Sequence, residues 1–391
     1  MNNNLNKIPN KLNNNFNIIN NNKFNYINKM KNNFNNNLNK INNAFNKSNK
    51  KVKTFNINKN GINNNNNKYA ITNNFNINND HKNSNNTNKI ELSEKSFKDL
   101  VKKYSIPLFR MSEFEFIKII GQGSFGKIYL VKEKTENKEY AMKILNCKGY
   151  YEIIQYLEEF EFLYKISNEN IIKVYKYKQE KKQLSPLLTE LYLYVLMEKA
   201  ECDWEHEIET RRKNKQFYRV EQLYLILNQL VSGLIFLQKN KIAHRDIKPQ
   251  NILVFPQNIY KITDLGEAKM NLNNEKQKQT FVGSELFMSP LLYNGLRQNK
   301  NSINHNPFKS DVYSLGLCFL YAMTLNLNVI KIIREKKYLK NKVDVIKNIK
   351  DLPEYPIRLW NIIFKMIEYE ENNRYDFIEL GKYLPKVNFE K

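Results

Sequence analysis

The sequence has few of the residues from which disulfide-stabilised or zinc-binding proteins are built. Its 391 residues include three cysteines, Cys147, Cys202 and Cys318, which lie far apart and show no CxxC spacing. An odd number of scattered cysteines argues against a disulfide framework and against a zinc site, and fits a reducing compartment. We therefore expect a protein of the cytoplasm or the nucleus.

Long apolar runs are also missing. No stretch approaches the roughly 18–20 apolar residues that cross a bilayer, and the longest, around 315–323, is typical of a buried helix. The first residues are Asn and Lys rather than an apolar segment, so we expect neither a secretory signal nor a transmembrane segment. Hydrophobic residues still make up 41% of the chain, which is enough for a sizeable core over part of its length.

Acidic residues are nearly absent from residues 1–90, which contain fourteen Lys and one Asp, Asp80. This segment carries +13 of the formal net charge of +24, and Asn occupies 41 of its 90 positions. Asn competes with its own backbone for hydrogen bonds, and the apolar residues are too sparse to offset the entropy of the chain. The composition therefore predicts a disordered low-complexity tail.

The function of this tail has several interpretations. Its charge could attract nucleic acid or anionic lipid, although a solvated charged surface explains it more simply. Asn alternating with aromatic residues resembles prion-like tracts, which compositional drift would also produce. The lack of acidic residues resembles a mitochondrial transit peptide, but no Arg precedes Arg110 and the segment is long.

The composition changes near residue 91, and residues 114–385 have the patterns of a folded domain. Residues 91–113 are expected to form a linker with a short helix that Ser93 or Ser96 could cap and that Pro107 ends. Alternating and helical periodicities predict elements in the domain. The predicted strands are 114–120, 127–133, 139–145, 171–179 and 191–198, and the predicted helices are 151–166, 220–239, 310–323 and 357–369. A β-rich half followed by a helical half predicts an α+β fold with two lobes and a cleft between them.

A glycine-rich stretch joins the first two predicted strands. Its residues are Gly121, Gln122, Gly123, Ser124, Phe125 and Gly126. Glycines let a backbone approach phosphates with its N–H groups facing the anion. No helix follows, which argues against a dinucleotide fold. The stretch predicts a phosphate-binding loop, for which an ordinary glycine hairpin is the alternative.

Lys143 lies in the apolar strand predicted at 139–145. A buried lysine needs an acidic partner or a phosphate, because burying an unpaired charge is costly. The next predicted helix offers Glu158, Glu159 and Glu161, and Glu159 fits best by its distance from Leu163. A surface lysine on an edge strand is the alternative.

The segment 244–251, with the sequence HRDIKPQN, carries three groups suited to phosphoryl transfer. Asp246 can orient a hydroxyl and accept its proton, Lys248 can place a cation near the phosphoryl group, and Asn251 can offer an oxygen to Mg²⁺. Asp264 lies thirteen residues beyond Asn251, at the end of a short predicted strand. Its carboxylate suits a Mg²⁺ ion held against triphosphate oxygens, with an Asp-X-Gly turn as the alternative.

Together these residues resemble the eukaryotic protein kinase family, serine/threonine type, over roughly residues 114–384. The resemblance implies that Lys143 holds the α- and β-phosphates of ATP and pairs with Glu159. It implies that Asp246 is the catalytic aspartate and that Asn251 and Asp264 bind Mg²⁺.

The resemblance also assigns residues to the adenine ring and to the lobe junction. Met197 is similar to a gatekeeper, and the backbone of Glu198 and Ala200 would lie at the adenine. Three residues are similar to the apolar sandwich around that ring: Ile128, Ala141 and Leu253. Asp311 is similar to the buried carboxylate that braces the 244–251 loop.

An activation segment is expected from Asp264 to about Pro290. Ser284 stands where serine/threonine kinases place a residue in contact with the catalytic Asp and Lys. Thr280 resembles a threonine that an upstream kinase phosphorylates, and Arg245 could pair with that phosphate. An ordinary polar loop residue is the alternative for Thr280.

Four features depart from the family pattern. Leu265 replaces a Phe, and Gln250 replaces a Glu that some kinases use to contact substrate arginine. Leu291 replaces the Glu that would pair with Arg374, so either another acid substitutes or the activation segment is anchored differently. Residues 292–307 are long and Asn-rich, which predicts a loop insertion.

The leading hypothesis is an active Mg²⁺/ATP-dependent kinase that phosphorylates Ser and Thr of protein substrates. The alternative is a pseudokinase scaffold. Pseudokinases commonly lose the lysine or one of the two aspartates, whereas this chain retains Lys143, Asp246, Asn251 and Asp264.

Overall fold

The computed structural model describes residues 92–123, 126–185, 188–269, 276–349 and 351–385. The predicted tail at 1–90 lies outside these residues, as do Ser124 and Phe125 of the glycine-rich stretch.

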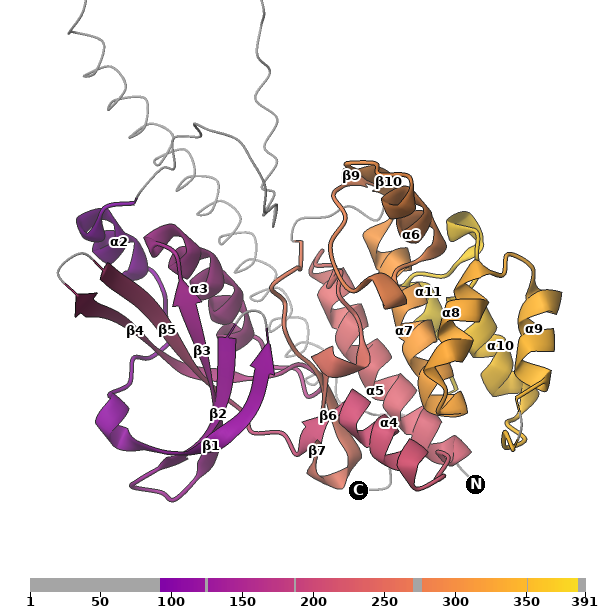
Figure 1. Ribbon diagram of the computed structural model, residues 1–391, viewed down its shortest axis with the longest axis horizontal. Helices are drawn as coiled ribbons and strands as arrows, with labels where there is room; N and C mark the ends of the chain where they lie inside the picture. Colours follow the sequence, from indigo (N-terminus) through magenta and orange to yellow (C-terminus); the bar gives the residue numbers. More distant parts are fainter. Residues whose placement is uncertain (1–91, 124–125, 186–187, 270–275, 350, 386–391) are drawn as a thin grey trace, which may run out of the picture. The chain divides into compact units, whose positions relative to one another are not determined.

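The N-terminal lobe is built on an antiparallel sheet of five strands in the order β1-β2-β3-β5-β4 (Figure 1). The strands are β1 (Phe114–Gly123), β2 (Gly126–Glu133), β3 (Glu139–Cys147), β4 (Val174–Ser185) and β5 (Leu188–Met197). Side chains alternate across the central strand β5, because successive residues of a strand point to opposite faces. Leu193, Val195 and Met197 belong to the main core. Tyr194 and Leu196 face a second, smaller cluster.

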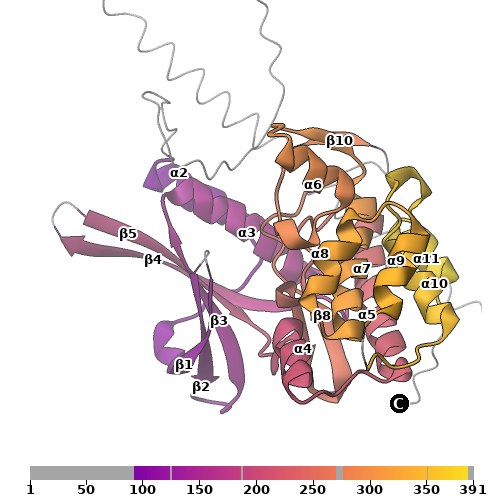
Figure 2. The same cartoon turned by 45° about the vertical axis from the view of Figure 1, so that its right-hand side comes forward.

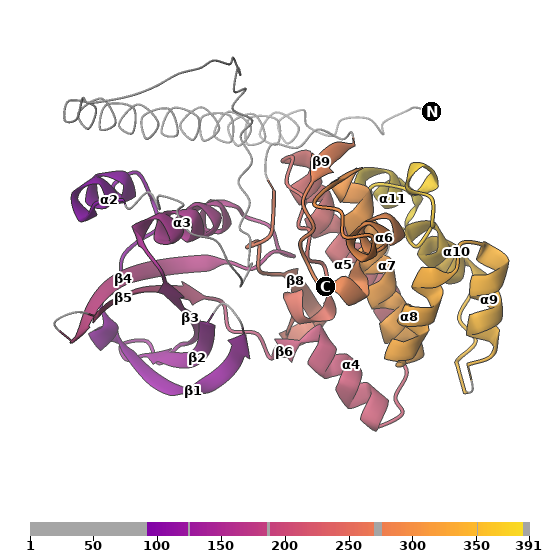
Figure 3. The same ribbon diagram turned by 45° about the horizontal axis from the view of Figure 1, so that its top comes forward.

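Helix α3 (Tyr150–Lys165) covers one face of this sheet, as Figure 3 shows. Its residues Ile153, Leu157 and Phe160 are buried at helical spacing and join the main core with the inner face of β5. The same helix carries Glu159, so the packing of its apolar face fixes the direction of that carboxylate.

A short helix, α2 (Glu94–Val101), precedes the sheet and packs against α3. Ser93 caps it by accepting the N–H of Ser96 at 3.2 Å. Phe97 is buried and stacks on Tyr150, with ring centroids 4.5 Å apart. The linker therefore contributes to the core of the N-terminal lobe.

The C-terminal lobe is helical, with α5 (Val220–Lys239) and α7 (Pro307–Thr324) at its centre. Nearly every residue of α7 is buried, as expected of a helix that is apolar around its whole circumference. The other helices of the lobe are α4 (Trp204–Lys213), α6 (Pro290–Arg297), α8 (Leu327–Glu335), α9 (Leu339–Lys347), α10 (Ile357–Met366) and α11 (Phe377–Tyr383).

Within the described residues, α5 alone is long and apolar enough to cross a membrane by length and composition. The sequence was expected to have no apolar stretch of membrane-spanning length, and α5 was overlooked in that expectation. A core helix of a folded domain passes the same test, and here Leu223, Leu227, Leu230 and Leu234 are buried in the core of the lobe.

The structure also has two small sheets besides the five-stranded one. The first has the order β6-β7-β8 and consists of β6 (Cys202–Asp203), β7 (Ile252–Phe255) and β8 (Ile259–Ile262). The second pairs β9 (Gln277–Gln279) with β10 (Ile303–His305). Figure 2 shows β10 beside α6. The prediction of a loop at 292–307 was therefore wrong, because β10 hydrogen-bonds to β9 and the end of α6 enters the same stretch.

The predicted α+β architecture is confirmed, with a β-sheet lobe followed by a helical lobe. The observed ends of the strands and helices differ from the predicted ends by a few residues. The strand predicted at 171–179 is observed as β4 (Val174–Ser185), with Ile171 forming only an isolated bridge to Ile262.

Candidate active site

The 244–251 loop is anchored to helix α7 by a buried carboxylate. Asp311 accepts the backbone N–H groups of His244 at 2.8 Å and of Arg245 at 2.9 Å. Burial raises the pKa of Asp311 to about 7, although these two N–H groups and the Arg245 charge act in the opposite direction. The prediction that Asp311 braces this loop agrees with this geometry.

His244 fixes the same loop from inside. Its Nδ1 accepts the N–H of Asp246 at 3.3 Å, so Nε2 carries the proton and donates to the carbonyl of Thr263 at 3.0 Å. Burial keeps the pKa of His244 below its ordinary value, which favours this neutral ring. The loop is thereby joined to the residue that precedes Asp264.

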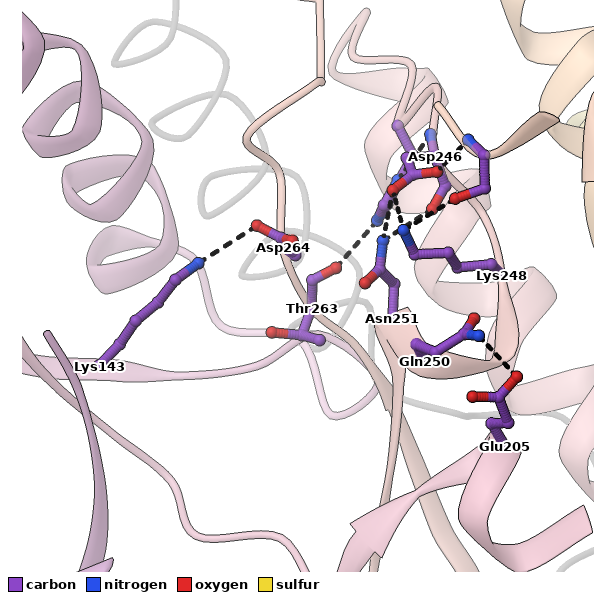
Figure 4. A network of polar contacts seen from close by, with 10 residues as sticks. Lys143, Glu205, Asp246, Lys248, Gln250, Asn251, Thr263 and Asp264 are labelled. Carbon is purple, nitrogen blue, oxygen red and sulfur yellow. Dashed lines mark hydrogen bonds and ion pairs between the residues drawn. The ribbon is translucent and has the colours of Figure 1, made fainter. Parts of the chain in front are cut away.

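Asp246 receives hydrogen bonds on both carboxylate oxygens (Figure 4). Oδ1 accepts the N–H of Ser284 at 2.7 Å, and Oδ2 lies 2.7 Å from Nζ of Lys248 and accepts Nδ2 of Asn251 at 3.0 Å. Burial alone would raise the pKa of Asp246. The hydrogen bond and positive charge of Lys248 and the hydrogen bonds from Ser284 act in the opposite direction and leave the pKa below its ordinary value. Asp246 is therefore ionised at neutral pH and can accept a hydrogen bond from a hydroxyl group.

Ser284 closes the network. Its Oγ accepts a hydrogen bond from Nζ of Lys248 at 2.9 Å, so Lys248 bridges Asp246 and Ser284. The predicted contact of Ser284 with both residues is present.

Lys143 extends from β3 toward Asp264, with 3.3 Å between Nζ and Oδ1 (Figure 4). Glu159 is buried on α3, and its Oε1 accepts the N–H of Leu265 at 3.1 Å. The predicted ion pair between Lys143 and Glu159 is therefore wrong in this structure. Burial raises the pKa of Glu159 to about 7, even though Lys143 opposes the rise. The more exposed carboxylate of Asp264 pairs with the lysine instead.

Of the three candidate glutamates on α3, Glu159 is the one that lies at the site. Glu158 pairs with Lys103 at 3.3 Å, and Glu161 accepts the N–H groups of Ser105 and Ile106. Only Glu159 reaches the residue that follows Asp264.

The two predicted metal ligands offer oxygen atoms of the kind that Mg²⁺ prefers. Nδ2 of Asn251 donates to the carbonyl and carboxylate of Asp246, which reserves its Oδ1 for accepting or for coordination. Asp264 presents a partly exposed carboxylate. The described residues hold no cluster of three or more metal-ligating His, Cys, Asp or Glu. A hard cation here would complete its shell with phosphate and water oxygens, as Mg²⁺ does in phosphoryl transfer.

The residues predicted to surround adenine lie on the strands that border the lobe junction. Ala141 pairs with Met197 across β3 and β5, and Ile128 on β2 pairs with Lys143. Leu253 lies on β7.

Glu198 and Ala200 follow β5 in the connection to the second lobe. The N–H of Glu198 already donates to the carbonyl of Lys173 at 3.2 Å, which leaves its carbonyl for a ligand. In the glycine-rich stretch, Gly123 and Gly126 are register partners of β1 and β2.

The activation segment contacts the 244–251 loop through its backbone. Nη2 of Arg245 donates to the carbonyl of Thr280 at 3.1 Å. Arg245 therefore lies next to Thr280, as expected, but binds its main chain. Phosphorylation of Thr280 remains a prediction.

Within the described residues Arg374 forms no ion pair that replaces the missing Glu at Leu291, although the charges of Glu371, Glu368 and Glu370 act on it. Its guanidinium is buried and donates to three backbone carbonyls, those of Glu368, Lys309 and Tyr369. Burial lowers its pKa to about 10. None of these carbonyls belongs to the activation segment, so that segment is anchored elsewhere.

Sequence reasoning missed Glu205 on α4. Nε2 of Gln250 donates to Oε1 of Glu205 at 2.6 Å, which brings a carboxylate beside the loop where Gln250 stands (Figure 4). The two residues are 45 positions apart, and no local pattern in the sequence connects them.

Lys143 from the sheet lobe points toward Asp264, and Asp246 and Asn251 lie on the helical-lobe side of the same network (Figure 4), which is the arrangement of a two-lobed kinase-type domain. Residues 114–383 match the family model described as the protein kinase domain. The chain belongs to the protein kinase family, as its sequence motifs predicted.

Curated relatives are serine/threonine-type kinases at modest identity. Calcium-dependent protein kinase 4 of Plasmodium berghei is 28% identical over 267 residues, covering 66% of this chain and 46% of its own. Serine/threonine-protein kinase Nek4 of Mus musculus is 29% identical, covering 54% of this chain and 25% of its own. Ribosomal protein S6 kinase 2 alpha of Gallus gallus is 30% identical, with coverages of 55% and 27%. The chain therefore spans less than half of the length of these three relatives.

Proposed function

We propose that the protein is an active serine/threonine protein kinase that transfers the γ-phosphate of ATP to protein hydroxyls. The observation that carries this function is the shared network of Asp246, Lys248, Asn251 and Ser284. A carboxylate held ionised, with a cation beside it and an amide oxygen left for coordination, is the arrangement that phosphoryl transfer needs.

Mg²⁺-bound ATP would supply the transferable γ-phosphoryl group and the neutralisation of its charge. Asp246 would orient the substrate hydroxyl and accept its hydrogen bond, and Lys248 would offset negative charge on the transferred group. Asn251 and Asp264 would hold the cation through their side-chain oxygens. Lys143 would leave Asp264 to bind the phosphates, and its charge would then attract the carboxylate of Glu159.

Specificity for Ser and Thr is supported by Lys248 and its bond to Ser284. Lys248 lies between the carboxylate of Asp246 and Ser284 of the activation segment. The relative Nek4 is a serine/threonine-protein kinase by name, which agrees with this specificity.

The test is transfer of labelled γ-phosphate from Mg²⁺-ATP to a mixed Ser/Thr/Tyr peptide set by the full chain. Asp246→Asn and Asp264→Asn should each abolish transfer. Asp99→Asn makes the same chemical change on exposed helix α2 and should leave transfer unchanged. Label incorporated equally by wild type and Asp246→Asn would exclude the proposed site.

A pseudokinase is the second candidate, and the Lys143–Asp264 pair is the observation in its favour. An inactive scaffold would keep this pair in the presence of Mg²⁺-ATP, whereas an active kinase would exchange it for contacts between Lys143 and the phosphates. Distinguishing the kinase from the scaffold requires measuring both ATP binding and phosphate transfer. A chain that binds Mg²⁺-ATP and never transfers phosphate is the scaffold.

Regulation at Thr280 and binding by residues 1–90 can be tested separately. If an upstream kinase acts on Thr280, Thr280→Ala should lower turnover while leaving ATP affinity intact, and equal turnover would dismiss that switch. A role of residues 1–90 in binding nucleic acid or anionic lipid predicts salt-sensitive binding that their deletion removes. We also propose a cytoplasmic or nuclear location.

A further inference from the structure

The end of the activation segment is held by side chains from two helices of the C-terminal lobe. The turn at Glu285–Phe287 presents three consecutive carbonyls to them. Nη1 of Arg334, on α8, donates to the carbonyl of Glu285 at 2.7 Å and to that of Leu286 at 3.2 Å. Oγ of Ser314, on α7, donates to the carbonyl of Phe287 at 2.8 Å.

Arg334 is built into this position. It is 6% exposed, and its guanidinium carbon lies 3.5 Å from the centroid of the Tyr293 ring on α6. Its Nε has no hydrogen-bond partner among the described residues. A buried guanidinium with an unsatisfied donor is costly, so an apolar residue would suit packing alone better. This cost indicates a role for the hydrogen bonds that Arg334 does make.

The turn held by Arg334 begins directly after Ser284. Ser284 donates its N–H to Asp246 and accepts from Lys248, at 2.7 and 2.9 Å. The turn itself is a single 3₁₀ turn with two backbone hydrogen bonds of 3.0 and 3.3 Å, which is too short to be rigid alone. Its position, and with it the position of Ser284, therefore depends on the groups that bind its carbonyls.

We propose that Arg334 is a positioning residue that anchors the activation segment in this chain. Arg374 is occupied by carbonyls outside the segment, and Leu291 offers it no charge. Arg334 holds the turn from α8 and keeps Ser284 within hydrogen-bond distance of Asp246 and Lys248. This role in catalysis rests on the proposed kinase function.

The chain offers a matched control in Arg297, on α6. Arg297 touches the same tyrosine, donating to the Tyr293 hydroxyl at 2.8 Å, but it is exposed. Within the described residues it forms no hydrogen bond or ion pair with the turn, although its charge acts on Glu285. Arg334→Leu and Arg297→Leu therefore both remove an arginine from Tyr293, and only the first removes a bond to the activation segment.

The first measurement is hydrogen exchange of the amides of residues 284–288 in the full chain, without nucleotide. Arg334→Leu should speed their exchange by about tenfold or more while α5 keeps its protection, and Arg297→Leu should match wild type. Unchanged exchange at 284–288 in Arg334→Leu would overturn the anchor, whether or not the protein is an active kinase.

The second measurement is steady-state peptide phosphorylation with ATP affinity measured in parallel. Arg334→Leu should lower kcat by about 10- to 100-fold, with the Kd for Mg²⁺-ATP within about twofold of wild type. Arg334→Lys, which can still donate to a carbonyl, should recover part of the loss. A wild-type chain without any transfer would refute the proposed function, while the exchange result would still decide the anchor.

Ser314→Ala keeps the test decisive if Arg334→Leu does not fold. This variant removes the Oγ that lies within hydrogen-bond distance of the carbonyls of Phe287, in the turn, and Ser310, within α7, and it should change the same amides by a smaller factor. If both Arg334→Lys and Ser314→Ala exchange and turn over as wild type does, the anchoring role is wrong.

Discussion

Gly283 is a position where adding a single methyl group should cost much of the activity. It precedes Ser284 and has φ of +91°, in the region that favours glycine. A Cβ atom built there would lie 2.3 Å from the carbonyl oxygen of Arg245 and 3.3 Å from Oδ1 of Asp246. The first distance is far below ordinary contact, and the oxygen belongs to rigid backbone.

The size of the effect of Gly283→Ala follows from these distances. Relief of the clash requires the two backbones to separate by about 1 Å. The bond from Ser284 N–H to Asp246, now 2.7 Å, would then exceed hydrogen-bond distance. We expect a loss of about 100-fold in kcat from this displacement, and a loss of about 1–3 kcal/mol in the free energy of unfolding from backbone strain.

The assay compares Gly283→Ala with Gly149→Ala, by peptide phosphorylation and urea unfolding. Gly149 has φ of −174°, and no atom lies within 4 Å of its added Cβ, so this control should stay within about 1 kcal/mol and near wild-type turnover. Wild-type turnover in Gly283→Ala would refute the close contact between the activation segment and the 244–251 loop.

Three further variants test the surroundings of the site. Because the pKa of Glu159 rises from 4.5 to about 7 on folding, the folded state holds a proton that the unfolded state has lost, and the free energy of unfolding should fall between those pH values by at most about 3 kcal/mol. Glu159→Gln, which can still accept the N–H of Leu265, should remove this fall in urea titrations at pH 5 and 8, and parallel curves would contradict the shift. Asp311→Asn places an amide NH₂ against a backbone N–H and should lower the unfolding free energy by about 1–3 kcal/mol and turnover by more than tenfold, which chemical denaturation and the peptide assay would measure. Phe97→Ala should cost about 3 kcal/mol because it empties the contact with Tyr150, whereas a loss below about 0.5 kcal/mol would show that α2 adds nothing to the core.

Much of the site could be predicted because its chemistry lies in short segments. Asp246, Lys248 and Asn251 are within six residues, and their spacing alone specifies the catalytic loop. The fold class followed from the switch between alternating and helical periodicity, since each period reflects which faces are buried.

The incorrect or missing predictions concern contacts between distant segments. Lys143 pairs with Asp264 while the buried Glu159 accepts the N–H of Leu265, and burial of a particular carboxylate is not visible in sequence. The pairing of β9 with β10 joins a Gln/Lys segment to the Asn-rich stretch 292–307, and neither composition gave a strand signal. Arg334 likewise binds backbone carbonyls, which carry no side-chain identity to recognise.

The most direct test of the central claim is the identity of the residues phosphorylated when the full chain is incubated with Mg²⁺-ATP and a mixed peptide set. Mass spectrometry should find phosphoserine and phosphothreonine with wild type and neither with Asp246→Asn. Mg²⁺-ATP binding by wild type without any phosphorylated product would contradict the account, and so would products that persist in Asp246→Asn.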